Sequence, residues 1–199
     1  VSDTYANAVL LCLEANDPQM AFNFAERARS RALLDSVTTG LSAILQKEEA
    51  EPITLAKVQK ALPAGALLLA YFTTGLVEIP DNRPGSTPRP ERHRFPEAKT
   101  LIFAVTRDGV QVHDASLSPN DLRPGRLESV VERHLLQPQI RRTLYDRLVA
   151  PVEKSLQGKR RVCLVPHGPL HYIPFQALIA ADGETLLRDD GPQLIYAPS

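Results

Sequence analysis

Apolar residues in the first part of the chain recur at helical spacing. Tyr5, Val9 and Leu13 follow one another at intervals of four residues, which places them on one face of a helix. The tripeptide Asn-Asp-Pro at 16–18 then interrupts the pattern. Its aspartate is a suitable N-cap for a second helix that has the proline at its first position. The pattern therefore predicts a helical hairpin over residues 1–38.

The second of these helices carries a stripe of small residues. Ala21, Ala25 and Ala28 share one face, with Phe24 beside them. Tetratricopeptide repeats use a stripe of this kind, because small side chains let paired helices approach closely. A single pair of helices cannot form the binding groove of a repeat array, and an ordinary helical hairpin accounts for the same residues. The residues alone leave both interpretations open.

Residues 39–64 form a connector that leads from the hairpin to the first strand. We predict a short helix at 54–61, which the Pro-Ala-Gly segment at 63–65 ends. The composition then changes, because "ALLLAYF" at 66–72 is a continuous apolar run of strand length. Such a run is typical of a strand that is buried on both of its faces.

Residues 76–98 have the composition of a mobile surface loop, with five prolines among charged and polar residues. The segment also contains four arginines: Arg83, Arg89, Arg92 and Arg94. Apart from Phe95, it offers no aromatic side chains that could stack on bases. The basic residues therefore indicate a solvated loop and not a nucleic-acid interface.

The segment "TLIFAVTRDGVQVHDASL" predicts a β-hairpin. Strands at 100–106 and 110–114 flank Asp108-Gly109, a pair that is favoured in tight turns. The second strand alternates valines that point inward with polar residues that point outward. We therefore expect His113 to point to solvent or to a rim, where it would not bind a metal.

Helical spacing returns at 126–136 and at 138–157, and Pro151 divides the second of these segments into two helices. Short apolar strands follow at 161–165 and 193–197. The succession of buried strands and helices predicts an α/β fold with helices on the faces of the sheet.

Composition and charge exclude several classes of function. The chain has 199 residues, of which 43% are hydrophobic, and 23 cations balance 23 anions. We therefore expect no general attraction to nucleic acid or to a membrane surface, and no segment is apolar enough to span a bilayer. Cys12 and Cys163 lie in apolar patterns, so we expect both to be core residues and not a disulfide pair. This expectation favours a location in the reducing cytoplasm. The absence of an initiator Met and the uncovered strand before Ser199 lead us to expect a fragment of a longer polypeptide.

His167 is the candidate catalytic base, because it follows a predicted strand in an α/β sheet and imidazole titrates near neutral pH. His171 lies four residues later. The thiol nearest in sequence, that of Cys163, lies inside the strand, where we expect it to be buried and inert. Gly168-Pro169 separates the two histidines and rules out the helix that would bring them together on a zinc ion.

A structured loop is the alternative to a hydrolase site built from these histidines, and the residues favour it. Pro166 and Gly168 would fix a turn, and Pro174 would open a short helix. Leu170, Tyr172 and Ile173 would pack inward. The short helix would run through Phe175, Ala177 and Leu178.

Three ordered blocks of the sequence resemble the CHAT domain, a caspase-like domain that follows tetratricopeptide repeats. "RVCLVPHGPLHYIPFQAL" followed by "LIYAPS" is similar to the opening segment of that domain. "LYDRLVAPVEKSLQG" matches the segment before it, and "AERARSRALLDSV" resembles the last repeat helix that leads into it. The resemblance covers the chain from about residue 20 onward.

The resemblance implies a relation to caspases and separases, whose catalytic dyad is a histidine followed by glycine and a cysteine on the next strand. His167-Gly168 is not that pair, because the dyad histidine of the CHAT pattern lies well after the "APS" block and the position of His167 often carries Asp in relatives. We therefore expect both dyad residues to lie beyond Ser199, and we assign no catalytic, cofactor-binding or metal-binding residue in this chain.

The predicted organisation is a TPR-like helical hairpin at 1–38, a helical connector at 39–64 and the N-terminal part of a CHAT domain at 65–199, with the mobile loop 76–98. The fold class is α/β, with the hairpin followed by a partial caspase-like mixed sheet and flanking helices. The expected function is the non-catalytic scaffold of a cysteine peptidase. The alternative is a degenerate module that binds protein partners through its TPR-like region.

Overall fold

A computed structural model describes residues 2–40, 52–75, 97–118, 137–186 and 191–197 of the chain. The predicted loop at 76–98, except for its last two residues, and the predicted helix at 126–136 lie outside these ranges. Among the described residues, no helix has both the length and the apolarity that are needed to cross a bilayer.

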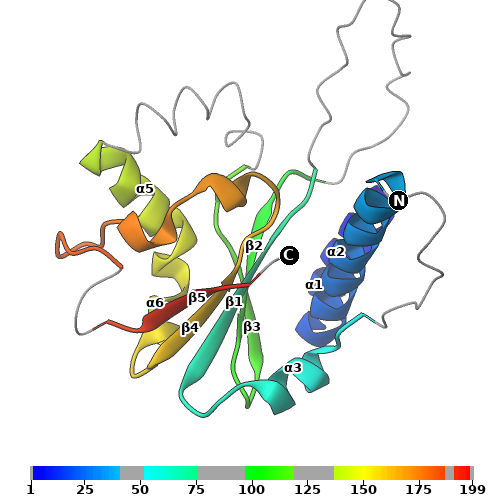
Figure 1. The fold of residues 1–199 in the computed structure, drawn as a ribbon, viewed down its shortest axis with the longest axis horizontal. Helices are drawn as coiled ribbons and strands as arrows, with labels where there is room; N and C mark the ends of the chain where they lie inside the picture. Colours follow the sequence, from blue (N-terminus) through cyan, green and yellow to red (C-terminus); the bar gives the residue numbers. More distant parts are fainter. Residues whose placement is uncertain (1, 41–51, 76–96, 119–136, 187–190, 198–199) are drawn as a thin grey trace, which may run out of the picture.

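The first two elements are the predicted helices. Helix α1 spans Ser2–Glu14 and helix α2 spans Pro18–Gly40, and the two pack side by side (Figure 1). Asn16 has a positive φ of 56°, which reverses the chain between them. The carboxylate of Asp17 accepts a hydrogen bond of 2.9 Å from the backbone N–H of Met20, so that Asp17 is the predicted N-cap.

A five-stranded mixed sheet follows, with strand order β3-β2-β1-β4-β5 (Figure 1). Strand β1 pairs antiparallel with β2 and parallel with β4, so β1 lies at the centre of the sheet. Strand β4 pairs in parallel with β5 at one edge, and β2 pairs antiparallel with β3 at the other. The strands are β1 (Ala66–Thr73), β2 (Thr100–Val105), β3 (Val110–Asp114), β4 (Arg161–Val165) and β5 (Gln193–Tyr196). Each lies where the apolar pattern predicted it.

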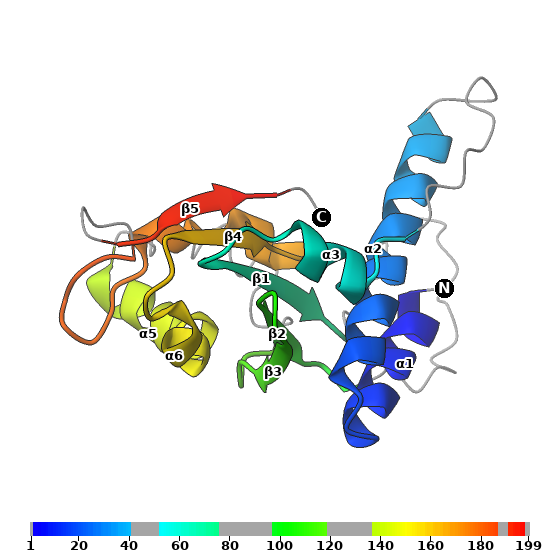
Figure 2. The same cartoon turned by 90° about the horizontal axis from the view of Figure 1, so that it is seen from below.

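Strand β1 is buried along its whole length because helices cover both faces of the sheet (Figures 1 and 2). Leu67, Leu69 and Tyr71 face one apolar cluster, and the alternate residues between them face a second. This arrangement accounts for the continuous apolar run in the sequence. The fold is therefore mixed α/β, consistent with a partial caspase-like fold.

The first covering layer consists of α1, α2 and the short helix α3 (Leu55–Ala61). Ala21 and Ala25 are fully buried, as their small-residue stripe predicted. The aromatic side chain that reaches the sheet is Phe22, whereas Phe24, which lies beside the stripe in the sequence, is half-buried. The Phe22 ring is 1% exposed and meets Phe103 of β2 edge to face, with 5.7 Å between ring centroids. The sheet-facing side of α2 therefore includes Phe22 as well as Ala21 and Ala25 of the stripe.

The second layer contains α5 (Pro138–Leu148), a 3-10 helix at Ala150–Val152 and α6 (Glu153–Leu156). The break in the middle confirms the division that Pro151 predicted. The hydroxyl of Tyr71 donates a hydrogen bond of 2.9 Å to the carbonyl of Leu148, and thereby joins the central strand to this layer. Gly158 ends the helical segment with a φ of 69°.

The predicted hairpin is present as β2 and β3, closed by a hydrogen bond of 2.9 Å between the N–H of Thr106 and the carbonyl of Gly109. His113 departs from the prediction. It lies opposite Ile102 and is half-buried, because β3 contacts the 3-10 helix at Ala150–Val152. Its Nε2 atom is buried without a hydrogen-bond partner within the described ranges. The outward side of this edge strand is therefore partly covered.

Candidate functional site

His167 lies where the carboxyl ends of the parallel strands β1 and β4 meet. The register aligns Ala70 with Val165, so His167 comes beside the last residues of β1. His167 is also the N-cap residue of a 3-10 helix at Gly168–Tyr172, and Gly168 has a φ of 56° that turns the chain away from the sheet. This edge of the sheet is the usual place for functional residues in open α/β folds.

Strand β1 holds the imidazole ring of His167 in a fixed orientation. The N–H of Thr73 donates to Nδ1 at 3.1 Å, and the hydroxyl of Thr73 lies 2.8 Å from the same atom. The ring also stacks on Phe72, with centroids 4.9 Å apart and an interplanar angle of 23°. Because Nδ1 accepts the amide hydrogen, the ring proton must reside on Nε2.

Helix α2 contributes a buried cation to the same place. The side chain of Arg29 is 4% exposed, and its guanidinium donates to the carboxylate of Glu26 and to the backbone carbonyl of Tyr71. The guanidinium carbon lies 6.0 Å from the centroid of the Phe72 ring, on which His167 also stacks. Arg29 therefore connects the helical hairpin to the carboxyl end of the central strand.

The surroundings of His167 suppress its basicity. Burial lowers its pKa to about 3, and the positive charge of Arg29 and the neighbouring His171 contribute in the same direction. Burial and Arg29 also lower the pKa of His171, whose side chain is exposed. A base whose conjugate acid has a pKa near 3 accepts protons poorly at neutral pH, so His167 is ill suited to general-base catalysis.

Two groups near His167 carry nucleophilic atoms. The hydroxyl of Thr73 is within hydrogen-bond distance, but Thr73 is 4% exposed and its partner is a very weak base. Cys163 is half-buried on the sheet face that also holds Val165, so it is not the fully buried core residue that the sequence indicated. Burial raises the pKa of its thiol, which lowers the thiolate fraction at neutral pH.

The segment after His167 is the structured loop that the prolines and the glycine predicted. Leu170 and Ile173 are buried, and a second 3-10 helix spans Phe175–Ala177. Tyr172, which we expected to pack inward, is 62% exposed. Residues three apart share a face of a 3-10 helix, so Leu170 and Ile173 point inward together and Tyr172 does not.

Arg29 and Thr73 are the members of this site that sequence reasoning missed. A signal for Arg29 was present, because it follows Ala21 and Ala25 at the same interval of four residues and so continues the buried stripe. Thr73 directly follows the apolar run at 66–72. Within the described part of the chain, no group of three or more histidine, cysteine or carboxylate side chains is arranged to hold a metal ion.

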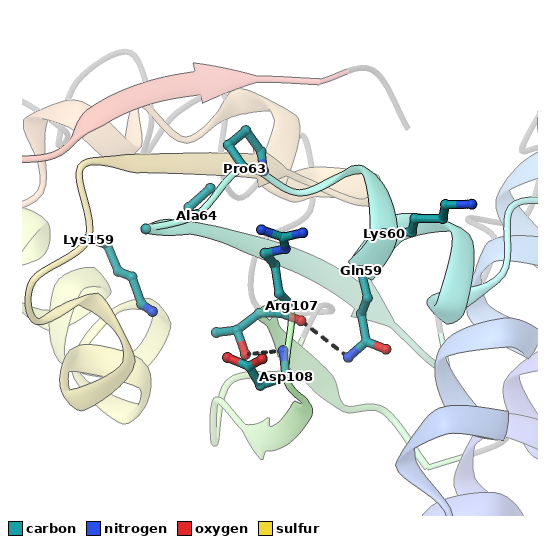
Figure 3. Close-up of a pocket in the computed structure, with 10 residues that line it drawn as sticks. Gln59, Lys60, Pro63, Ala64, Arg107, Asp108 and Lys159 are labelled. Atoms are coloured by element: carbon teal, nitrogen blue, oxygen red, sulfur yellow. Dashed lines mark hydrogen bonds between the residues drawn. The ribbon is translucent and has the colours of Figure 1, made fainter.

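A separate cavity of about 540 Å³ lies at the amino end of β1, between α3, the β2–β3 turn and the loop before β4 (Figure 3). Its lining includes Lys60, Arg107 and Lys159 together with Asp108. Because it lies at the opposite end of β1 from Thr73, this cavity is not part of the His167 site.

Comparison with known protein families relates one segment of the chain to a family. Residues 139–199 match the family model of the CHAT domain. This match supports the resemblance seen in the sequence, and the CHAT domain is linked to the caspase-like peptidase families. The match does not extend to the helical hairpin, so its TPR-like character stays a prediction. No curated protein and no solved structure matches the chain.

Proposed function

We propose that this chain, in which residues 139–199 match the CHAT domain, supplies the non-catalytic front of a caspase-like cysteine peptidase. In this role the sheet is a scaffold, and the helical hairpin is the junction between a repeat region and the peptidase domain. The proposed units are the TPR-like hairpin at 1–38, the connector at 39–64 and the CHAT segment at 65–199.

The contact of Arg29 with the carbonyl of Tyr71 is the observation that carries this proposal. It places a buried charge from the hairpin at the carboxyl ends of β1 and β4. Glu26 lies on α2 as well, so the ion pair orients the guanidinium within the helix, and the hydrogen bond to the carbonyl of Tyr71 is the contact that holds α2 to the sheet. Separating α2 from the sheet would leave that carbonyl without this donor. A change in the position of α2 would therefore change the end of the sheet at which α/β enzymes assemble their sites.

We assign no catalytic role to His167 or His171. The low pKa of His167 and its engagement by Thr73 support a structural role, in which the ring fixes the end of β4 against the end of β1. The thiolate and the histidine base of the peptidase reaction are proposed to lie outside this sequence. No cofactor and no metal enters the proposed mechanism, which is thiolate attack on a peptide carbonyl.

The experiment compares Arg29→Met with Arg27→Met in a longer polypeptide that continues beyond Ser199. Arg27 is an exposed cation on the same helix and makes the matched control. We expect the Arg29 variant to lose most of its peptidase activity and the Arg27 variant to keep it. Equal activity of the two variants in folded protein would contradict the junction, and no activity in any form would contradict the peptidase assignment.

A second candidate function is a non-enzymatic interaction module. Leu11 and Met20 favour it, because these apolar side chains on the helical hairpin are 63% and 43% exposed and could contact a protein partner. A sequence beyond Ser199 that lacks both a His-Gly pair and a later cysteine would favour this alternative. In either case we propose a cytoplasmic location, which the free thiols of Cys12 and Cys163 support because disulfides are rare in that compartment.

A further inference from the structure

The cavity at the amino end of β1 gathers positive charge from three separate segments. Lys60 comes from α3, Arg107 from the β2–β3 turn and Lys159 from the loop between α6 and β4. Figure 3 shows Arg107 extending toward Pro63, with Lys159 on the far side of Ala64, whereas Lys60 points away along the rim. Asp108 is the only carboxylate among the described residues that line the cavity. The chain as a whole has no net charge, so this excess of cations is local.

These cations are not used to stabilise the fold within the described ranges. The ion pairs recorded there join Arg29 to Glu26 and Lys99 to Glu97 and Asp114, and none involves Lys60, Arg107 or Lys159. Arg107 is exposed and Lys159 is half-buried. Arg107 and Lys159 border one concave surface against the single carboxylate of Asp108, so the local potential is positive and attracts an anionic group.

Backbone and side-chain hydrogen bonds hold the walls of the cavity. The side-chain amide of Gln59 donates to the carbonyl of Thr106 at 3.2 Å and thereby joins α3 to the β2–β3 turn. The N–H of Arg160 donates to the carbonyl of Gly65 at 3.0 Å and joins the start of β4 to the start of β1. A site that is formed before binding loses less conformational entropy when a ligand enters.

The volume of the cavity and the residues that line it restrict which ligands could bind there. The volume falls in the range of roughly 300–1,000 Å³ that is typical of ligand pockets, which is more than one inorganic anion needs. None of its lining residues, all of them in the described ranges, is aromatic, so the cavity offers no platform on which a nucleobase could stack. Its apolar residues are small, namely Pro63, Ala64 and Ala66.

We propose that this cavity binds an acidic segment of a partner polypeptide, whose carboxylates pair with Arg107 and Lys159. This inference does not depend on the proposed function, because the cavity and the His167 site lie at opposite ends of β1. Along the eight residues of this strand the separation is about 25 Å. A segment that binds here leaves the carboxyl end of the sheet free.

The test measures binding of a fluorescein-labelled peptide rich in glutamate to the full chain by fluorescence anisotropy. The same peptide with glutamine in place of glutamate is the ligand control. Arg107→Gln and Lys159→Gln are the test variants, and Arg147→Gln is the matched control, because Arg147 is an exposed arginine on α5 outside the cavity. Circular dichroism melts verify that each variant is folded.

We expect the glutamate peptide to bind more tightly than the glutamine peptide, with an affinity that falls as salt rises. Each test variant should weaken binding roughly threefold and the two together roughly tenfold, as for exposed charge pairs. Arg147→Gln should leave the affinity unchanged. The proposal is overturned if the two peptides bind equally, if neither binds, if Arg147→Gln weakens binding as much as the test variants, or if a labelled single-stranded oligonucleotide binds more tightly than the peptide.

Discussion

The buried pair of Arg29 and Glu26 gives the sharpest prediction for stability. Arg29→Met keeps the length and apolar volume of the side chain but leaves the carboxylate of Glu26, which is 15% exposed, without its cation. It also removes the donor to the carbonyl of Tyr71. Breaking a buried ion pair costs about 3–5 kcal/mol, and the residual exposure of Glu26 places the expected loss near the lower end, at about 3 kcal/mol.

A double-mutant cycle separates this coupling from general damage. Glu26→Gln alone should cost about 1–2 kcal/mol, because the amide oxygen still accepts from Arg29. The double variant removes both charges and should cost about 2 kcal/mol, since neutral replacement of a buried pair is often tolerated. The expected coupling energy, measured from urea unfolding followed by circular dichroism, is therefore about 2–3 kcal/mol. Losses that add within about 0.5 kcal/mol would refute the argument that the two charges depend on each other.

The same ion pair predicts that the stability lost in Arg29→Met depends on pH. Burial already raises the pKa of Glu26, and Arg29 partly offsets this effect. Without the guanidinium, the pKa of Glu26 in the folded Arg29→Met variant rises further above its unfolded value. The folded variant then binds a proton more tightly than the unfolded chain, so its deficit in stability relative to wild type should grow as the pH rises above the unfolded pKa of glutamate, about 4.3. A deficit that does not vary with pH would contradict this assignment of the charge.

Three further predictions test individual features. His167 has a pKa of about 3 in the folded state, below its unfolded value of about 6.5. The contribution of this ring to stability should therefore be lost as the pH falls from about 6.5 to 3, and the urea midpoint of His167→Gln should fall less over this range than that of the unmodified protein. Phe22→Ala should cost about 3–5 kcal/mol, whereas Phe24→Ala, at a half-buried position, should cost less than half as much in the same unfolding assay; equal losses would show that Phe22 is not the aromatic side chain that reaches the sheet. Gly158→Ala should lower stability by about 1–2 kcal/mol through its positive φ alone, because an added Cβ meets no atom within 4 Å, and an unchanged melting temperature would contradict this.

Sequence patterns predicted the elements of the fold because those patterns are local. The apolar run at 66–72 reflects burial on both faces, and Asp17 and Pro151 each end or begin a helix by their own chemistry. The match at residues 139–199 agrees with the family that the quoted blocks indicated. The stripe of small residues indicates the direction of close helix packing, but it does not show whether Phe22 or Phe24 reaches the sheet.

The His167 site could be predicted only in part, since its contacts join distant segments. Thr73 and His167 are 94 residues apart in sequence, and Arg29 and Tyr71 are 42 apart. No periodicity links such positions. The local turn chemistry of Gly168 and Pro174 did predict the loop, but the partner of the ring and the cation beside it follow from the sheet register and from the docking of α2.

The most direct test of a scaffold role is hydrolysis of a fluorogenic peptide library by the purified 199-residue chain, with His167→Gln and Cys163→Ser variants measured in parallel. We expect no turnover above the buffer control by any of the three proteins, because His167 is a very weak base and burial raises the pKa of the Cys163 thiol. Turnover by the unmodified chain that either substitution abolishes, in protein that remains folded, would contradict this expectation.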